Sequence, residues 1–592
     1  MTNPAIVAQG AVRRLPRLAL WLLCLAYVLP GFIGRTPWKR ADITAFGYMA
    51  ELAAGHTDWL APRLGGMPTD LDALLPYWLG AWALQLAPDW INPGFAARIP
   101  FIGLLVLTLL SVWYGIYHLA RSPLAQPVSF AFGGEAEPRD YARALADGGL
   151  LAFIACLGLA QLAHETTPAA AQLCFVALSF YAYAALPHHR WLPLWSAGIG
   201  LTGLTLSGAP ILALLLSTGG LLFHALDRAQ AVENPARHRH GLWRLLALTV
   251  FIAVLASVLD LWHWRVRWSE FGLPDAALRW QSLGRMLLWF TWPVWPFALW
   301  TLWRWQGRLL AHQPSRHLSL PLCWTLLTVG TTALTPAGDR ALLLSLPALA
   351  ALAAFALPTM SRGLTALIDW FTLLFFTLCA LFIWTYWIAM QTGVPPQPAA
   401  NIAKLAPYFE PRFVILPFVF ALLGTLIWAW LVKWRIGRHR AALWKSMVLP
   451  AGGVTLCWLL LTTLWMPPLD HARSYGPLIQ RMDAVILGGG AATSSQASSS
   501  QATPDTAQAS CLTWFGLSRA QVAALQYHSR VVRARGLEPL TDATHCTWLV
   551  IDRDKLQQTP GLLDSSRWQR VTLLEHPRQG GEDGLVVLRR LP

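Results

Sequence analysis

Long apolar runs alternate with short polar segments along most of this chain. Between Leu18 and Trp465 the apolar runs are roughly 17–25 residues long, the length that an α-helix needs to cross a bilayer. We therefore predict an all-α polytopic membrane protein with about thirteen spans. They lie at 17–34, 97–119, 147–163, 169–186, 191–206, 209–225, 243–262, 284–303, 319–334, 340–358, 366–388, 411–432 and 446–466. One long helix kinked near Ser207–Pro210 is the alternative for the fifth and sixth spans.

The polar segment 35–86, between the first two spans, has a helical pattern of its own. Apolar residues recur at helical spacing from Lys39 to Gly55 and again from Leu71 to Leu86. Both stretches combine a broad apolar face with Trp or Tyr, as helices that lie in a membrane interface do. We expect two juxtamembrane helices in this first loop.

The composition changes after residue 466. Residues 488–510 are rich in Gly, Ser and Ala and predict a flexible segment. Beyond it we predict a helix at 518–530, opened by a capping box of Ser518 and Gln521. Strands are predicted at 511–517, 547–552, 571–576 and 585–591. The chain therefore divides into a transmembrane domain, 1–466, and a small α/β domain, 467–592.

The distribution of charge orients the predicted spans. The formal net charge is +15, but Lys and Arg cluster in alternate loops, from Arg13–Arg17 to Lys433–Lys445. This positive-inside pattern places these loops and the N-terminus in the cytoplasm and, with an odd number of spans, the tail outside. This pattern explains the positive net charge, so we expect no nucleic acid as a partner.

Two of the eight cysteines lie outside the apolar runs. They are Cys511 and Cys546, both in the polar tail. Because the predicted compartment of the tail permits disulfides, we predict that they are bonded to each other.

The first loop also carries a family resemblance. Asp42 opens a juxtamembrane helix, HTDWLAPRLGGMP follows at 56–68, and YWLGA precedes the second span at 77–81. This order resembles the first loop of the GT-C glycosyltransferases, in particular the aminoarabinose transferases that modify lipid A, with the protein O-mannosyltransferases more distant. The resemblance runs from the N-terminus to about Tyr475. It implies a bacterial inner-membrane enzyme that moves a sugar from undecaprenyl phosphate to a periplasmic acceptor, such as lipid A, a glycan or a protein.

The chemistry of such a transfer assigns roles to two carboxylates. A base must take the acceptor's proton, and cations must hold the leaving phosphate. The resemblance makes Asp42 the candidate base; by its position alone it is a charge that stabilises a helix N-terminus. Glu165 is the second candidate catalytic residue, and a water-facing loop carboxylate is the alternative. His164 beside it is either a proton carrier or an interfacial side chain with satisfied hydrogen bonds.

The lysines of the family's phosphate elements are missing. The corresponding stretches are Thr69–Ala73 and Leu206–Pro210, and neither contains Lys. Arginines of the non-cytoplasmic loops are candidate substitutes, because guanidinium groups suit bidentate contact with phosphate; contact with lipid headgroups is the alternative for each. They are Arg63, Arg265, Arg267, Arg279, Arg285 and Arg340.

Two alternatives remain open at this point. Asp70 and Asp72 offer oxygen ligands to a divalent metal, the one cofactor that the sequence suggests, or form a solvated turn. The missing lysines leave a rival function, a non-catalytic lipid-binding or envelope-assembly protein that retains the fold. A secondary transporter is disfavoured, because the charged residues lie at loop edges rather than within the spans.

Overall fold

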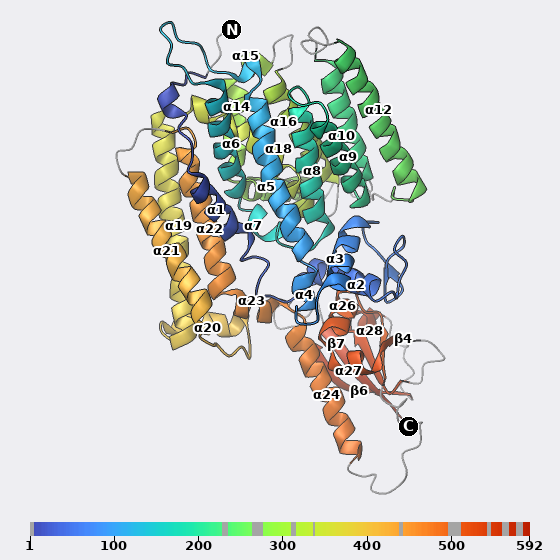
Figure 1. Ribbon diagram of the computed structural model, residues 1–592. Helices are drawn as coiled ribbons and strands as arrows, with labels where there is room; N and C mark the ends of the chain where they lie inside the picture. Colours follow the sequence, from blue (N-terminus) through green and yellow to red (C-terminus); the bar gives the residue numbers. More distant parts are fainter. Residues whose placement is uncertain are drawn as a thin grey trace.

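Helices make up most of the structure, and a small mixed sheet lies at one end of the helical bundle (Figure 1). The computed structural model describes residues 5–227, 235–262, 276–309, 315–334, 338–436, 442–494, 511–540, 546–558, 567–575 and 584–591. Residues 5–16 lie at the end of the bundle opposite the sheet (Figure 1). This architecture confirms the predicted fold class, an all-α polytopic membrane protein with a small α/β region after it.

Each predicted span contains a helix in the described chain. These helices are α1 (Arg17–Val28), α5 (Ile99–Ala120), α6 (Pro138–Ile154), α8 (Pro168–Ala185), α9 (Leu192–Leu206), α10 (Pro210–Ala225), α12 (Pro235–Val258), α14 (Val294–Arg304), α16 (Arg316–Leu334), α18 (Leu346–Ala354), α19 (Arg362–Thr392), α21 (Ile415–Ile436) and α22 (Lys445–Leu464). Of the described helices, six are long and apolar enough to cross a membrane by length and composition. Others, such as α1, α9 and α10, are shorter apolar helices.

Three predicted spans are interrupted rather than continuous. The run 147–163 contains the end of α6 and the short α7 (Leu159–Leu162), 284–303 contains α13 (Ala276–Phe290) and α14, and 340–358 contains α17 (Gly338–Leu343) and α18. Pro293 separates α13 from α14, because proline cannot donate a backbone hydrogen bond. The kinked-helix alternative at 207–210 is wrong: Gly208 has a left-handed φ of +82°, and Pro210 opens a separate helix.

Small residues allow close helix packing at the centre of the bundle. α8 is buried along its whole length. A Cβ added to Gly200 of α9 would lie 3.0 Å from the backbone nitrogen of Ser179 in α8. Such close approach through small residues is typical of helices that associate within membranes. By contrast α21 is mostly exposed, and its large apolar side chains point outward, where lipid would surround them.

The first loop has the two predicted juxtamembrane helices. They are α2 (Lys39–Ala53) and α3 (Leu75–Leu86), and a hairpin of β1 (Arg63–Leu64) and β2 (Met67–Pro68) connects them. The short α4 (Pro93–Ala96) leads into α5. The Leu74 N–H donates to the Leu206 carbonyl at 2.8 Å, so the loop between α9 and α10 lies against the first loop.

The C-terminal region contains a five-stranded sheet with the order β4-β3-β5-β7-β6. The strands are β3 (Leu512–Phe515), β4 (Leu537–Pro539), β5 (Trp548–Asp552), β6 (Trp568–Glu575) and β7 (Gly584–Arg590). β3 is parallel to β4 and β5, whereas β7 is antiparallel to β5 and β6. The sequence predicts four of these strands and misses β4, which is only three residues long. The predicted capping box at the start of α26 (Arg519–His528) is confirmed, and so is the Cys511–Cys546 disulfide.

Two further helices connect the bundle to the sheet. α23 (Met466–Arg473) follows the last span, and α24 (Gly476–Ser494) continues beyond it. Within the predicted flexible segment, residues 488–494 are helical, and the remainder, 495–510, lies outside the described residues. Its flexibility stays a prediction. The division of the chain at residue 466 stays a prediction.

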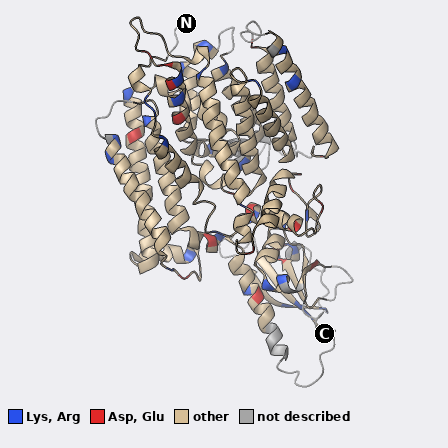
Figure 2. Cartoon of the chain, in the orientation of Figure 1, with Lys and Arg blue, Asp and Glu red and all other residues tan. Residues whose placement is uncertain are grey.

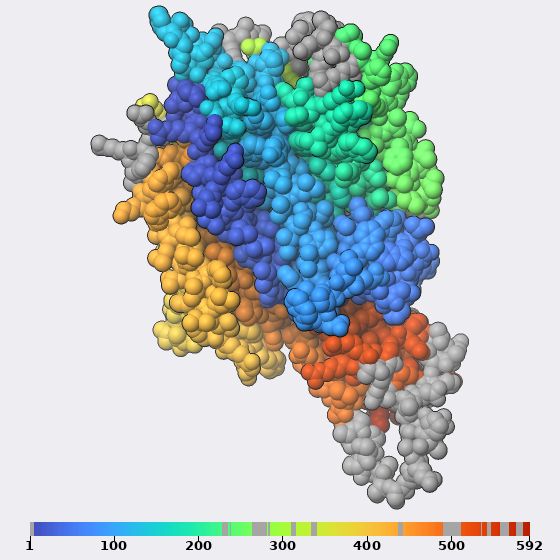
Figure 3. Space-filling model, viewed as in Figure 1, coloured from blue at the N-terminus to red at the C-terminus, as the bar shows by residue number. Residues whose placement is uncertain are grey.

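The C-terminal sheet region rests on the first loop (Figures 1 and 3). α26 packs against α2, with the rings of Phe46 and Tyr527 4.9 Å apart. Arg519 forms an ion pair with Asp70. Lys and Arg side chains of the bundle gather mainly at the opposite end (Figure 2). The first loop thus lies between the helical bundle and the C-terminal region, at the end of the bundle with less positive charge.

Candidate functional site

Asp42 lies in the first turn of α2, fully buried, with hydrogen bonds to both carboxylate oxygens. Oδ2 accepts from Arg35 Nη1 at 2.7 Å and from the Trp38 N–H at 3.3 Å. Oδ1 accepts from the N–H and the hydroxyl of Thr166 at 2.8 and 2.7 Å. Thr166 belongs to the short loop before α8, so Asp42 joins this loop to the first loop.

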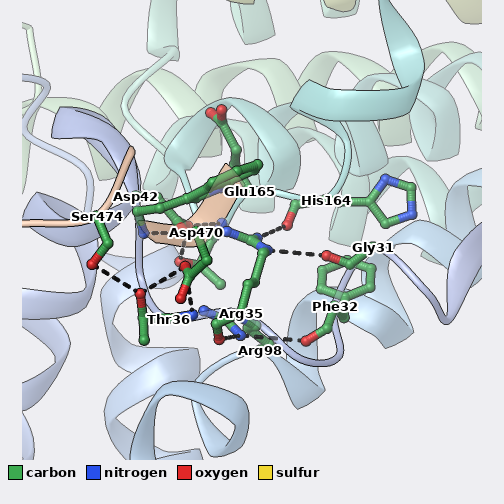
Figure 4. Close-up of polar contacts among 12 residues, drawn as sticks. Gly31, Phe32, Arg35, Thr36, Asp42, Arg98, His164, Glu165, Asp470 and Ser474 are labelled. Carbon is green, nitrogen blue, oxygen red and sulfur yellow. Dashed lines mark hydrogen bonds and ion pairs between the residues drawn. The ribbon is translucent and has the colours of Figure 1, made fainter. Parts of the chain in front are cut away.

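Arg35 is the partner that gives this cluster its shape (Figure 4). Besides Asp42, its guanidinium donates to the Gly31 carbonyl at 3.0 Å and to the His164 carbonyl at 2.6 Å. The ring of Trp38 lies beside it, with the guanidinium carbon 5.2 Å from the ring centroid. A planar group with several donors is well suited to holding three acceptors at once.

The charges around Asp42 keep it ionised. Burial alone would raise the pKa of this carboxyl, but Arg35, Arg98 and the hydrogen bonds from Thr166 together lower the pKa below its ordinary value. A carboxylate stabilised in this way binds a proton weakly.

Arg98 is a second buried cation at the site, just before the first turn of α5. Its Nη1 donates to the carbonyls of Arg35 and Phe32 at 2.7 and 3.3 Å. Its Nη2 has no hydrogen-bond acceptor among the described residues. A buried charged donor without a partner is unfavourable unless a ligand or water satisfies it.

Asp470, on α23 after the last predicted span, is a third acidic residue at this end of the bundle. Its Oδ1 accepts from the backbone N–H of Thr36 at 3.0 Å and from the Thr36 hydroxyl at 2.8 Å. The same hydroxyl lies 3.1 Å from Ser474 Oγ, which lies 3.4 Å from Nε2 of His528 in α26. A chain of polar contacts therefore links the first loop, α23 and the C-terminal region.

His164 is fixed by backbone acceptors rather than open to a reaction. Nδ1 faces the Ala160 carbonyl, and Nε2 lies 3.1 Å from the carbonyls of Tyr27 and Val28. Burial lowers the pKa of His164 to about 4. A Cβ on Gly31 would lie 2.4 Å from the imidazole ring, which explains the glycine there. A neutral imidazole donates from one nitrogen only, so one ring nitrogen of His164 donates to a carbonyl while the other only packs against one. Of the two alternatives for His164, this enclosed position favours the interfacial side chain.

The structure places the second candidate catalytic residue in a different ion pair. Glu165 is buried and accepts from Arg340 at 3.0 Å and from Gln161 at 3.3 Å. In Figure 4 its carboxylate points away from Arg35. The alternative of a water-facing carboxylate is therefore wrong for Glu165, and Arg340, a candidate phosphate ligand, is brought to it.

Of the remaining candidate arginines, the two whose side chains the structure describes do not join the Asp42 cluster. Arg63 is exposed on the hairpin and donates to the Gly66 carbonyl at 3.4 Å. Arg285 is exposed on α13. Arg265 and Arg267 lie outside the described residues, and so does the side chain of Arg279. Their predicted phosphate contacts stay predictions.

The metal suggestion gains no support. Asp70 is ion-paired with Arg519 of α26, so a cation already neutralises one carboxylate of the pair Asp70 and Asp72. Within the described ranges, no group of three or more His, Cys, Asp and Glu side chains is arranged to hold a metal ion.

Sequence reasoning missed Arg35, Arg98 and Asp470. The available signals were weak: Arg35 directly precedes the first juxtamembrane helix, Arg98 opens the second span, and Asp470 is the first acidic residue after the last span. None of these positions has a motif of its own, because their partners are distant in sequence.

The fold defines the class of this protein: it is a polytopic membrane protein with the GT-C fold. The structure is similar to crystal structures of ArnT from Cupriavidus metallidurans. With ArnT bound to undecaprenyl phosphate the TM-score is 0.57 at 12% identity, covering 97% of each chain. With ArnT in the apo state it is 0.55 at 14% identity, covering 97% of this chain and 98% of that one. No protein-family model and no curated protein matches. At such identity the likeness establishes the fold, which confirms the predicted one.

Proposed function

We propose that this chain is a membrane glycosyltransferase that moves a sugar from a polyprenyl-phosphate donor to a periplasmic acceptor. The observation that carries the proposal is the buried cluster of Asp42, Arg35 and Arg98, assembled by distant segments at one end of the bundle. A solved protein of the same fold binds undecaprenyl phosphate, which supports a lipid of this kind as the donor carrier. The acceptor is a lipid such as lipid A, a glycan or a protein, and the membrane is the bacterial inner membrane with the C-terminal region in the periplasm.

Arg98 is the cation that we assign to the leaving phosphate. Positive charge must stabilise the phosphate as its bond to the sugar breaks. Arg98 Nη2 is a buried donor without an acceptor in the described chain, and a phosphate oxygen would satisfy it with a strong charge-assisted bond. Arg340, beside Glu165, is the second candidate. These arginines would take the place of the lysines missing from 69–73 and 206–210.

The assignment of Asp42 as the base has a geometric requirement. Both of its oxygens are already occupied, by Arg35 and Trp38 on one side and by Thr166 on the other. To accept a proton, Asp42 would have to exchange one of these donors, such as the Thr166 hydroxyl, for the acceptor. Its lowered pKa also weakens it as a base at neutral pH.

The test measures transfer and binding together. The full-length chain is reconstituted in proteoliposomes with undecaprenyl phosphate that carries radiolabelled aminoarabinose or a hexose, and with lipid A and a cell-envelope fraction as acceptors. We expect label to move to an acceptor. We expect Arg98→Ala to weaken binding of undecaprenyl phosphate about 10–100-fold, the equivalent of one charge-assisted hydrogen bond. Arg14→Ala, a change of an exposed residue in the segment before α1, is the matched control.

One observation favours the rival function. The complete occupation of Asp42 by donors suits a purely structural cluster in a lipid-binding or envelope-assembly protein that retains the fold. The same experiment separates the two functions: binding of undecaprenyl phosphate without transfer from any of the labelled donors would reject the enzyme and leave the binding protein.

A further inference from the structure

We propose that Asp470, on α23, is the catalytic residue that takes the proton from the acceptor. The inference rests on the proposed glycosyl transfer and deepens it. It assigns the base to a segment after the last span, outside the loops that contain Asp42 and Glu165.

The position of Asp470 is fixed at one oxygen and open at the other. Thr36 donates twice to Oδ1, from its N–H at 3.0 Å and its hydroxyl at 2.8 Å. No donor in the described part of the chain is hydrogen-bonded to Oδ2, and the side chain is only half-buried. Figure 4 shows the carboxylate beside Thr36, close to Arg35 and Arg98. A substrate group could therefore reach Oδ2 while Thr36 holds the carboxylate in place.

The two fully buried carboxylates of this neighbourhood, Asp42 and Glu165, lack that combination. Asp42 accepts four hydrogen bonds and is fully buried. Glu165 accepts from Arg340 and Gln161, and it points away from Arg35 (Figure 4). Of these three carboxylates, Asp470 has the oxygen that can meet an acceptor without first losing a hydrogen bond from another described residue.

The surroundings also make Asp470 the stronger base. Burial raises the pKa of Asp470 above its ordinary value, although Thr36, Arg35 and Arg98 act in the opposite direction. The pKa of Asp42 is lowered. A general base accepts a proton more readily the closer its pKa lies to the working pH, so the difference favours Asp470.

The proposed step is balanced as follows. The acceptor's oxygen or nitrogen forms a bond to the anomeric carbon of the sugar, and its proton passes to Asp470 Oδ2. The bond between the anomeric carbon and the phosphate oxygen breaks, and its electron pair stays on that oxygen. Polyprenyl phosphate leaves as a dianion next to Arg98, and nothing is oxidised or reduced. Asp42 then has a positioning role, because it holds Arg35, whose backbone carbonyl accepts from Arg98.

The experiment compares Asp470→Asn with Thr36→Val in the full-length protein in proteoliposomes. Asp470→Asn keeps an oxygen for Thr36 but removes proton acceptance, so we expect kcat to fall about 10²–10⁴-fold while the affinity for undecaprenyl phosphate stays unchanged. Thr36→Val removes the hydroxyl's contacts with Asp470 and Ser474 but keeps the backbone hydrogen bond and the base, so we expect less than about a tenfold loss. Asp89→Asn, at an exposed carboxylate between α3 and α4, is the control for loss of charge, and Asp470→Glu should recover part of the activity.

Three outcomes would overturn the inference. If Asp470→Asn transfers sugar at the rate of the unmutated protein, Asp470 is not the base, and the proposed function stands without it. If Thr36→Val and Asp470→Asn lose equal activity and equal affinity, Asp470 has a structural role only. If the unmutated protein binds undecaprenyl phosphate without transferring sugar, the proposed function fails, and the role of Asp470 fails with it.

Discussion

Arg35 donates to Asp42 at 2.7 Å, and each of these side chains is 1% exposed. Breaking a buried ion pair on one side leaves an uncompensated charge, at a cost of about 3–5 kcal/mol. We therefore expect Arg35→Ala to lower the free energy of unfolding by that amount, measured by denaturation in detergent. The double variant Arg35→Ala/Asp42→Asn should regain part of the loss, because it removes both charges. Equal stability of the single and double variants would mean that the ion pair contributes little.

The pH dependence of transfer distinguishes the two candidate bases. If Asp470 is the base, activity is lost as the pH falls through its raised pKa. The acid limb of the pH–rate profile, where the rate falls with falling pH, then has its midpoint above the ordinary carboxyl pKa of about 3.9. If Asp42 is the base, the acid limb lies below that value, because its pKa is lowered. The hydrogen bonds from Thr36 favour the charged form of Asp470, so Thr36→Val should move the limb to higher pH.

The titratable and charged groups that face Asp470 determine how far its pKa lies from the ordinary value. Those from other elements are Arg35, Arg98, Tyr527 and, through Ser474, His528. A pH–rate profile from pH 4 to 8 (a range chosen around the reference values) checks the prediction. If Thr36→Val does not move the acid limb of the pH–rate profile, that limb reports the titration of a group other than Asp470.

Acid stability gives a separate readout for Asp42. Since its pKa is lower in the folded state than its ordinary value, ionised Asp42 stabilises the fold above the unfolded pKa. That contribution is lost as pH falls through the folded pKa. Unfolding midpoints measured between pH 5 and 3, a window around the ordinary carboxyl pKa, should therefore decline in the unmutated protein. The decline should be weaker in Asp42→Asn, and parallel curves would contradict the prediction.

The contact between α2 and α26 is tight enough to be disturbed by one methyl group. A Cβ on Gly47 would lie 2.7 Å from the Cβ of Ala523. We expect Gly47→Ala to loosen the C-terminal region and to speed its release by limited proteolysis. Adding Ala523→Gly to Gly47→Ala should reverse much of this effect, because it removes the clashing Cβ. The reversal is incomplete, because glycine within a helix costs about 1 kcal/mol of stability. If Gly47→Ala is cut no faster than the unmutated protein, the two helices are not pressed together.

The disulfide between Cys511 and Cys546 closes a separation of 35 residues. Removing a disulfide of this loop length costs about 2–4 kcal/mol. Cys511→Ser/Cys546→Ser should therefore lower the unfolding midpoint of the C-terminal region. Mass spectrometry of the unreduced protein should show the two cysteine peptides joined, and finding both as free thiols would contradict the bond.

The positive-inside pattern gives a topology to test. We expect a reporter fused at the N-terminus to be cytoplasmic and one inserted at Gln501 to be periplasmic. The same compartment for both reporters would mean an even number of spans.

The apolar pattern predicted the helices well, because span length is set by the bilayer and not by distant contacts. Interruptions such as the one at Pro293 were harder to place, since proline is also tolerated within membrane helices. In the C-terminal region, strand β4 was missed because it is short and lies beside β3 only through parallel pairing.

The site was predictable only where the chemistry lies in one segment. Asp42 stands out at the start of a helix next to a recognisable loop. Its partner Thr166 is 124 residues away, and Asp470 reaches Thr36 across 434 residues. Pairings at such distances leave no periodicity in a single sequence. The burial of Arg35 was hidden for the same reason, because an arginine between a span and a loop is usually exposed.

The hydrogen bonds between Thr36 and Asp470 can form only late in the synthesis of the chain. The two residues are separated by 434 positions, so at about 5–20 residues per second the ribosome needs roughly 20–90 s to synthesise the chain between them. During that time the first helices enter the membrane with Thr36 exposed at its edge. Under the proposed function, a nascent chain therefore lacks Asp470, the proposed base, until translation is almost complete, and a product of premature termination before α23 would not transfer sugar.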